Sequence, residues 1–455
     1  MSTPPGPPRE PELEQPLAGL NSRPRGLRQG LQMQVHGRTV RLRGFQRQLK
    51  GPWRWLLILG PGLIAAAAGN DAGGIATYSA AGAQFGYDLI WVMLLITVSL
   101  AVVQEMCARL GAATGRGLLD LIREHYGLRW ALLALAVILL ANAGLIITEF
   151  VGVGAAAELL GISPWLAVPA AALLVWYLVI FGSYDAVEKI FLGMTLVFFA
   201  YPVAAILAHP DAGALLRGAL VPTIHFNQAY LLVLVGLMGT TITPYMQLFE
   251  QSSMVERAVA RRHYGPERVD SYVGAIFSNL MSIAMIVATA ATLHAKGATI
   301  LQTAADAAKA LEPVAGPAAK VLFAVGLLGA SLLAGAVLPL ATAYALAETF
   351  GQPKGVSLDF RRAPLFFGLF TILIVLGAGL ALLPNVPVIP LLVAVQVFNG
   401  ALLPVILFFI LRLANNARLM GDLKNRQREN VLGWGTAILV TTAVVVLFAV
   451  QLFSH

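Results

Sequence analysis

Long apolar runs follow one another through almost the whole chain, and they constrain the fold more than any other feature of the sequence. Each run is long enough to cross a ~30 Å hydrocarbon core, which requires about 20 residues in a helix. Lipid offers the backbone no hydrogen-bond partners, so we expect every run to be helical. The eleven expected spans are residues 54–84, 88–112, 129–158, 164–182, 187–208, 229–260, 271–295, 318–348, 363–383, 386–413 and 431–452.

The composition excludes an ordinary soluble enzyme. Only 12% of the residues are charged and 58% are hydrophobic, whereas a soluble domain carries about 25% charged residues. A net charge of +8 is compatible with nucleic-acid binding, but the basic residues are scattered between apolar runs. We therefore expect a lipid bilayer around the chain and no nucleic-acid partner. We also expect no enzymatic activity and no resident cofactor, because no nucleophile–base pair or nucleotide motif stands out.

The distribution of basic residues predicts the orientation in the membrane. If the N-terminus is cytoplasmic, all but four of the 31 Lys and Arg lie in cytoplasmic segments. This asymmetry predicts a cytoplasmic N-terminus and an outside C-terminus in a bacterial plasma membrane. Residues 1–50 are rich in proline and arginine and lack the apolar segment of a signal peptide. We expect a basic, disordered cytoplasmic tail there, followed by an eleven-span domain at residues 51–455.

Two of the expected spans are interrupted near their middle. The first contains the run Asn70-Asp71-Ala72-Gly73-Gly74, and the sixth contains Ile242-Thr243-Pro244-Tyr245. Glycine is a poor helix former, and proline removes a backbone donor. Either interruption alone could be a simple kink. Because they occur five spans apart, they predict inverted five-helix repeats with a midplane site between discontinuous helices.

Asp71 is the strongest candidate for a functional residue. A carboxylate at membrane depth is costly and usually functional, although Asp71 could also simply cap the following half-helix. Unwound backbone beside it would offer carbonyl oxygens, such as those of Ala68 and Thr240. These oxygens suit hard cations such as Mg²⁺, Ca²⁺ or Mn²⁺ rather than Zn²⁺ or Cu⁺.

Other polar residues at the same depth could line this site. Thr240 and Thr243 could supply hydroxyls, unless they bond back to their own helix. Gln396 and Asn399 lie three residues apart on one helix face and could be site walls or links between helices. Among the buried acids, Glu149 and Glu250 could carry protons or pair with a buried arginine. The pair Glu105 and Arg109, four residues apart, is interpreted as structural.

Five stretches of the chain resemble the NRAMP divalent-metal transporters. These stretches are GPGLIAAAAGNDAGGIATYSAAGAQFGY, QEMCARLGAATGRGLLDLIREHYG, TEFVGVGAAAELLG, GTTITPYMQLFEQSS and VAVQVFNGALLPVI. The resemblance extends from the first span to the eleventh and leaves out only the N-terminal tail. It implies the all-α LeuT-type fold, with two five-helix repeats plus an eleventh helix, and transport by alternating access.

The chain departs from the family pattern at the site itself. The first-helix motif Asp-Pro-Gly-Asn is here Asp71-Ala72-Gly73-Gly74, so the family's asparagine is replaced by Gly74. The sixth-helix motif Met-Pro-His is here Thr243-Pro244-Tyr245, and the family's second histidine is Glu250. Loss of the thioether removes the preference for softer metals, and Gly74 is expected to leave room for a hydrated ion. Loss of histidines removes groups that titrate between pH 5 and 8.

These departures resemble the NRAMP-related magnesium transporters, which take Mg²⁺ and Mn²⁺ without proton coupling. The family usually has an aspartate three residues before Glu149, and here that position is Ile146. We therefore expect a monomeric, passive importer of Mg²⁺ and Mn²⁺. The alternatives are a proton-coupled Mn²⁺ or Fe²⁺ symporter, a carrier of an organic solute with this fold, and a non-transporting scaffold. The metal-binding residues that we expect are Asp71, Ala68, Gly74, Thr240, Thr243 and Gln396, with Tyr245, Glu250, Glu149 and Asn399 around them or along the pathway.

Overall fold

The computed structural model describes residues 32–35, 38–41, 69–181, 199–257, 259, 261, 264–297, 300–356, 358–384 and 387–453. The chain divides into two compact units, Met1–Arg54 and Trp55–His455. The first unit contains a hairpin of β1 (Gln32–Val35) and β2 (Arg38–Arg41), paired antiparallel. The expected disorder of residues 1–50 stays a prediction.

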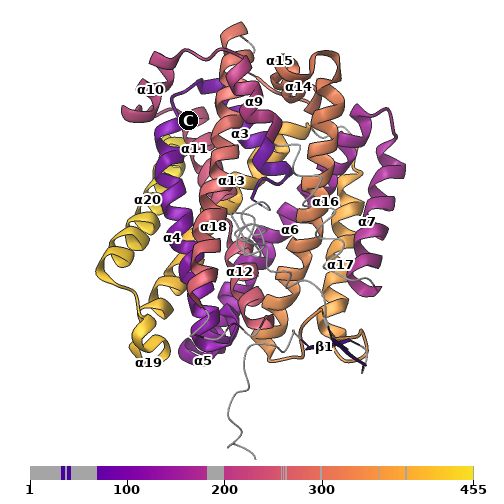
Figure 1. Ribbon diagram of the computed structural model, residues 1–455, viewed down its shortest axis with the longest axis vertical. Coiled ribbons are helices and arrows are strands. Elements are labelled where there is room, and N and C mark those ends of the chain that lie inside the picture. The colour runs from indigo at the N-terminus through magenta and orange to yellow at the C-terminus, as the bar shows by residue number, and fades with distance from the viewer. Residues whose placement is uncertain are drawn as a thin grey trace, which may run out of the picture. The chain divides into compact units, whose positions relative to one another are not determined.

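Helices make up nearly all of the described part of the second unit (Figure 1). The longer helices are α3 (Ala72–Phe85), α4 (Ile90–Thr114), α5 (Leu118–Tyr126), α6 (Leu128–Leu159), α7 (Pro164–Phe181), α9 (Ala200–Leu207), α10 (Ala212–Leu220), α11 (Gln228–Thr241), α12 (Pro244–Glu256), α13 (Tyr264–Thr292), α16 (Ala319–Phe350), α17 (Pro364–Ala381), α18 (Val388–Ala414) and α20 (Gln427–Phe453). Short helical turns are η3 (His294–Lys296), α14 (Ala304–Ala308), η4 (Lys309–Leu311), α15 (Glu312–Ala315), η5 (Gly316–Ala318), α19 (Ala417–Met420) and η6 (Gly421–Leu423).

Nine stretches of the described chain are long and apolar enough to cross a membrane. They are α4, α6, α7, α11 with α12, α13 with η3, the stretch from α14 to α16, α17, α18 and α20. The other two expected spans are described only in part. The first continues as α3 and the fifth ends as α9, whereas their earlier residues, Ala68 among them, lie outside the described residues. The described parts of these two runs are also helical.

The break in the sixth span is confirmed at the expected residues. Helix α11 ends at Thr241 and α12 begins at Pro244, with Ile242 and Thr243 between them. Proline is favoured at the first position of a helix, where its missing N–H costs nothing. Pro244 therefore starts α12 instead of kinking a continuous helix.

The broken helices lie inside the unit, whereas single apolar helices cover its outside. In α11 and α12 together 89% of the most apolar window is buried, against 22% in α7 and 33% in α20. Figure 1 shows α7 and α20 at opposite edges and α12 near the middle. Backbone groups at the break, which lack the hydrogen bonds of a continuous helix, are thus kept away from lipid.

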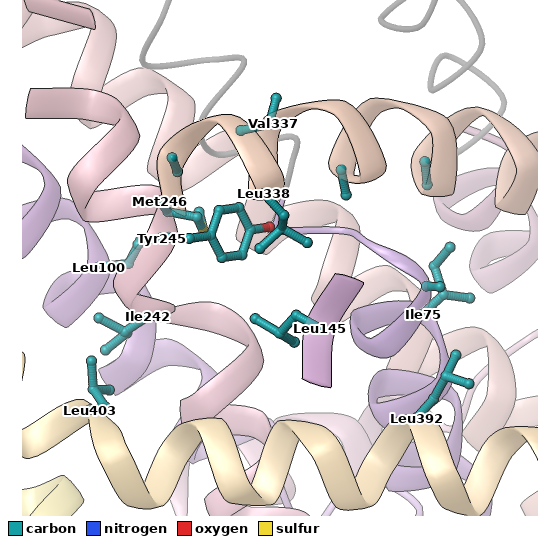
Figure 2. Packing of buried hydrophobic residues seen from close by; sticks show 14 of the residues in the cluster. Ile75, Leu100, Leu145, Ile242, Tyr245, Met246, Val337, Leu338, Leu392 and Leu403 are labelled. Carbon is teal, nitrogen blue, oxygen red and sulfur yellow. The ribbon is translucent and has the colours of Figure 1, made fainter. Parts of the chain in front are cut away.

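Close helix crossings hold this interior together. A Cβ on Gly239 of α11 would lie 2.1 Å from the carbonyl oxygen of Gln396 and 2.5 Å from the backbone N of Gly400, both in α18. Small residues at such crossings let backbones approach, which is how helices associate in lipid. Large apolar side chains fill the remaining space, including Tyr245 and Met246 of α12 and Leu338 of α16 (Figure 2).

Candidate metal centre

Asp71 lies at the first break and caps the half-helix that follows. Its backbone is extended, with φ −66° and ψ 179°, and its Oδ1 accepts a hydrogen bond of 2.6 Å from the N–H of Gly74. The residue is fully buried, and Oδ2 makes no hydrogen bond in the described structure. The capping role and the ligand role are therefore compatible, because one oxygen caps α3 while the other remains available.

Oxygen atoms of the second break lie against the first. A Cβ on Gly74 would lie 2.7 Å from the carbonyl oxygen of Gly69 and 3.0 Å from Oγ1 of Thr240. The Thr240 hydroxyl is fully buried, lies near the hydroxyl of Tyr78 and does not bond back to its own helix. The space expected beside Gly74 is thus already lined by oxygen atoms. Glycine at position 74 permits the close approach of these oxygen atoms, and the space next to its Cα is not open as expected for a hydrated ion.

The tenth span contributes two amides to the same region. Nε2 of Gln396 donates to Oδ1 of Asp71 over 3.2 Å, and its Oε1 has no partner among the described residues. Nδ2 of Asn399 donates to the carbonyl oxygen of Gly239 over 2.7 Å, near the end of α11. Gln396 therefore forms a wall of the site. Asn399 instead orients the carbonyls at the end of the second broken helix.

Glu149 lies next to Asp71 although its helix is distant in sequence. Its Oε2 accepts a hydrogen bond of 3.3 Å from the N–H of Ala72, while Oε1 has no partner among the described residues. Glu149 is fully buried. Its partner in the described structure is thus the N-terminus of α3 rather than an arginine, which agrees with the preference of helix N-termini for negative charge.

Thr243 and Tyr245 lie at the start of α12. Thr243 is the N-cap residue, but its side chain makes no capping bond, and Oγ1 is fully buried without a described partner. The Thr243 hydroxyl lies near the Tyr245 side chain and is not used to cap α12. Tyr245 is fully buried in the electrostatic neighbourhood of Asp71 and Glu149.

Gln247, one turn beyond Thr243, was missed by the sequence reasoning. Both its Nε2 and its Oε1 are buried without a hydrogen-bond partner in the described structure. The only sequence signal is the spacing of four residues from Thr243, which places both on one helix face.

Glu250 lies farther along α12, six residues after Pro244. Its Oε1 accepts a hydrogen bond of 2.8 Å from the hydroxyl of Ser271 on α13, and its Oε2 has no described partner. Gln104 of α4 also contacts it. Glu250 therefore belongs to a separate polar cluster between α4, α12 and α13, and no hydrogen bond between described residues connects it to Asp71.

The chemistry of the centre is that of a hard cation site. The two breaks and the helices beside them carry two carboxylates, two hydroxyls and one amide oxygen without a described partner, and no thioether or imidazole is among them. Among the described residues, no group of three or more His, Cys, Asp or Glu side chains could hold a metal ion. A cation here would therefore be held by one or two carboxylates with neutral oxygens and water, an arrangement typical of Mg²⁺.

Fold and site together define a class: a polytopic membrane protein in which a broken helix and the start of α3 meet near a buried carboxylate. Solved structures share this fold. The chain is similar to the manganese transporter of Eremococcus coleocola, with a TM-score of 0.66, 20% identity and 88% of each chain covered. It is also similar to MhsT, solved in complex with L-phenylalanine, with a TM-score of 0.57, 15% identity and coverage of 86% of this chain and 98% of that one. The fold is the LeuT type, and within the described residues its sixth span is discontinuous.

Sequence comparison identifies the family. The model of the natural resistance-associated macrophage protein-like (Nramp) family matches residues 62–450. A divalent metal cation transporter MntH of Klebsiella pneumoniae is 30% identical over 402 residues, which cover 85% of this chain and 92% of that protein. The MntH of Deinococcus radiodurans is 31% identical over 411 residues, covering 86% and 89%. The chain belongs to the Nramp family.

Proposed function

We propose that this protein is a transporter that imports Mg²⁺, and also Mn²⁺, by alternating access and without proton coupling. The observation that carries the proposal is the fully buried Asp71 carboxylate at the first break, whose Oδ2 has no hydrogen-bond partner in the described structure. The oxygens of Thr240, Thr243 and Gln396 likewise lack a described partner. Such oxygens can bind a cation directly or through its water. A sulfur ligand, which would favour softer metals, is absent from these residues.

Family membership supports transport, because the curated relatives are named divalent metal cation transporters. We infer a plasma-membrane location with the N-terminus inside, on the basis of the Lys and Arg distribution. A doubly charged ion then gains about 4.6 kcal/mol per 100 mV on entry, at ~2.3 kcal/mol per charge. This driving force suffices for uptake without a second ion.

A second candidate function is proton-coupled uptake of Mn²⁺ or Fe²⁺. It is favoured by Glu149, which lies at the N-terminus of α3 beside Asp71 and has one free oxygen. A carrier of an anionic organic solute is disfavoured, because Asp71 would repel the substrate at the break.

The test is transport in liposomes that contain the purified full-length protein. Internal dyes report Mg²⁺, Mn²⁺ and pH, and the matched control is Asp71→Asn, which keeps a capping side chain but removes the charge. We expect Mg²⁺ entry that leaves the internal pH unchanged. Asp71→Asn should lower uptake at low cation concentration about 10–100-fold, as expected for loss of a charged partner. Entry of Mn²⁺ alone, with acidification inside, would establish the second candidate instead.

A further inference from the structure

Asn70 precedes the candidate ligand Asp71, and both ends of its side chain are held by one other helix. Its Nδ2 donates to Oγ of Ser278 over 3.1 Å, and its Oδ1 accepts from Oγ of Ser282 over 2.9 Å. Both serines belong to α13 and lie four residues apart, on the face that meets the first break. Asn70 is 3% exposed, and both serines are buried.

This asparagine differs from the other polar side chains around the site. Asp71, Thr240, Thr243 and Gln396 each have an oxygen atom without a described partner, whereas both polar atoms of the Asn70 amide are engaged. Asn70 is therefore poorly suited to bind the cation itself. Its two bonds instead fix the position of the peptide unit from which Asp71 extends.

The same contacts reach the second break. Ser282 also interacts with the hydroxyl of Tyr78 on α3, and this hydroxyl lies 3.0 Å from Oγ1 of Thr241 at the end of α11. Thr241 directly follows Thr240, whose hydroxyl lies against Gly74. A row of buried polar groups thus connects the residue before Asp71 to the residue after Thr240.

We propose that Asn70, held by Ser278 and Ser282, is a positioning residue that sets the geometry of the Asp71 carboxylate relative to the second break. A break in a membrane helix has few backbone bonds of its own, so its conformation depends on side-chain contacts. Groups that orient a metal ligand without touching the metal typically change metal affinity 10–100-fold when they are removed. This inference rests on the proposed function in one respect: the ligand whose binding is measured is a divalent cation.

The experiment compares variants of the full-length protein in detergent and in liposomes. Asn70→Leu keeps the approximate size and removes both bonds, while Ser282 can keep its bond of 3.1 Å to the carbonyl oxygen of Ser278. Ser282→Ala and Ser282→Thr form a matched pair that removes and retains the hydroxyl. The control is Asn279→Leu, because Asn279 is buried on the same helix but donates to Thr97 of α4, over 3.0 Å, away from the break.

Dissociation constants are measured by calorimetry with Mn²⁺ and with Mg²⁺ in separate titrations, and initial uptake rates give KM and the maximal rate. We expect Asn70→Leu and Ser282→Ala to raise the dissociation constant and KM about tenfold. The maximal rate per folded protein should stay within about twofold, and Ser282→Thr should restore wild-type affinity.

Two results would overturn the proposal. One is an unchanged KM in Asn70→Leu together with a lower melting temperature, which would make the contact merely structural. The other is an equal loss of affinity in Asn279→Leu, which would point to a general effect of losing a buried bond in α13. Wild-type binding of Mn²⁺ but not Mg²⁺ would refute the proposed magnesium specificity while leaving the Asn70 comparison intact.

Discussion

At the scale of single residues, the site contains side chains that use one polar atom in a hydrogen bond and keep an oxygen atom without a partner. Asp71 uses one oxygen to cap α3 and keeps the other free, and Gln396 donates its amide to Asp71 while its oxygen remains unpaired. A buried polar atom without a partner costs about 1–3 kcal/mol. The proposed cation would satisfy several such atoms at once.

A sulfur-containing side chain in place of Thr243 should change the selectivity of the site between Mn²⁺ and Mg²⁺. The variant Thr243→Met replaces the hydroxyl with a thioether, which suits Mn²⁺ better than Mg²⁺. We expect the ratio of Mn²⁺ to Mg²⁺ uptake to rise about tenfold, measured by competition in liposomes, mainly through loss of Mg²⁺ entry. The isosteric variant Thr243→Val is the control, because it removes the hydroxyl without adding sulfur. An equal ratio in Met and Val variants would contradict a role for ligand softness.

At the scale of elements, the first half of the broken sixth span is supported by a neighbouring helix as well as by α3. Helix α11 packs backbone to backbone on α18 through Gly239 and Gly400. Asn399 of α18 also bonds to the carbonyl oxygen of Gly239. These contacts support the end of α11, where helical carbonyl groups lack partners within the helix.

The crossing of α11 and α18 should tolerate no added methyl group. In Gly239→Ala the new Cβ would lie 2.1 Å from the carbonyl oxygen of Gln396, so the helices must separate. We expect a loss of stability of about 1–3 kcal/mol, seen as a lower melting temperature in detergent. Gly435→Ala is the matched control, because Gly435 also lies in a helix but has no atom near its position for a Cβ. Equal melting temperatures for the two variants would show that the crossing is loose.

At the scale of the whole second unit, ion pairs link helices at the end away from the breaks. Arg109 of α4 contacts Glu105 at 3.2 Å and Glu429 of α20 at 2.9 Å. Arg268 of α13 contacts Glu105 at 3.3 Å. The pair Glu105 and Arg109 is thus structural, as expected, but it is part of a network that joins three spans. α20, the last helix, is attached to the rest of the unit partly through this network.

Loss of Arg109 should destabilise the unit more than loss of a surface charge. In Arg109→Leu the Glu105 carboxylate, which belongs to a residue 1% exposed, loses one of its cationic partners. Removing one member of a buried pair typically costs 3–5 kcal/mol, and we expect about 3 kcal/mol because Arg268 remains. Thermal unfolding in detergent measures the effect. Adding Glu105→Gln to this variant should recover part of the lost stability. A double variant less stable than Arg109→Leu alone would contradict the explanation by an unpaired Glu105 carboxylate.

Much of the fold could be predicted from the sequence because lipid offers the backbone no hydrogen-bond partners. Apolar runs of sufficient length must form helices, so the spans follow from local hydropathy. The second break follows from Pro244, which begins α12. Asp71 was identified by its charge at membrane depth alone. These predictions depend on residues near one another in the chain.

Only the tertiary structure decided which side chains meet at the breaks. Gln396 and Asp71 are 325 positions apart, and Glu149 and Ala72 are 77 positions apart. Asn70 and Ser278, 208 positions apart, showed no sequence signal of their contact. Helix rotation and packing determine which face of one span meets another, and these depend on the fit of all spans together. The sequence by itself therefore determined where the chain crosses and breaks, whereas the packed fold determined which groups complete the site.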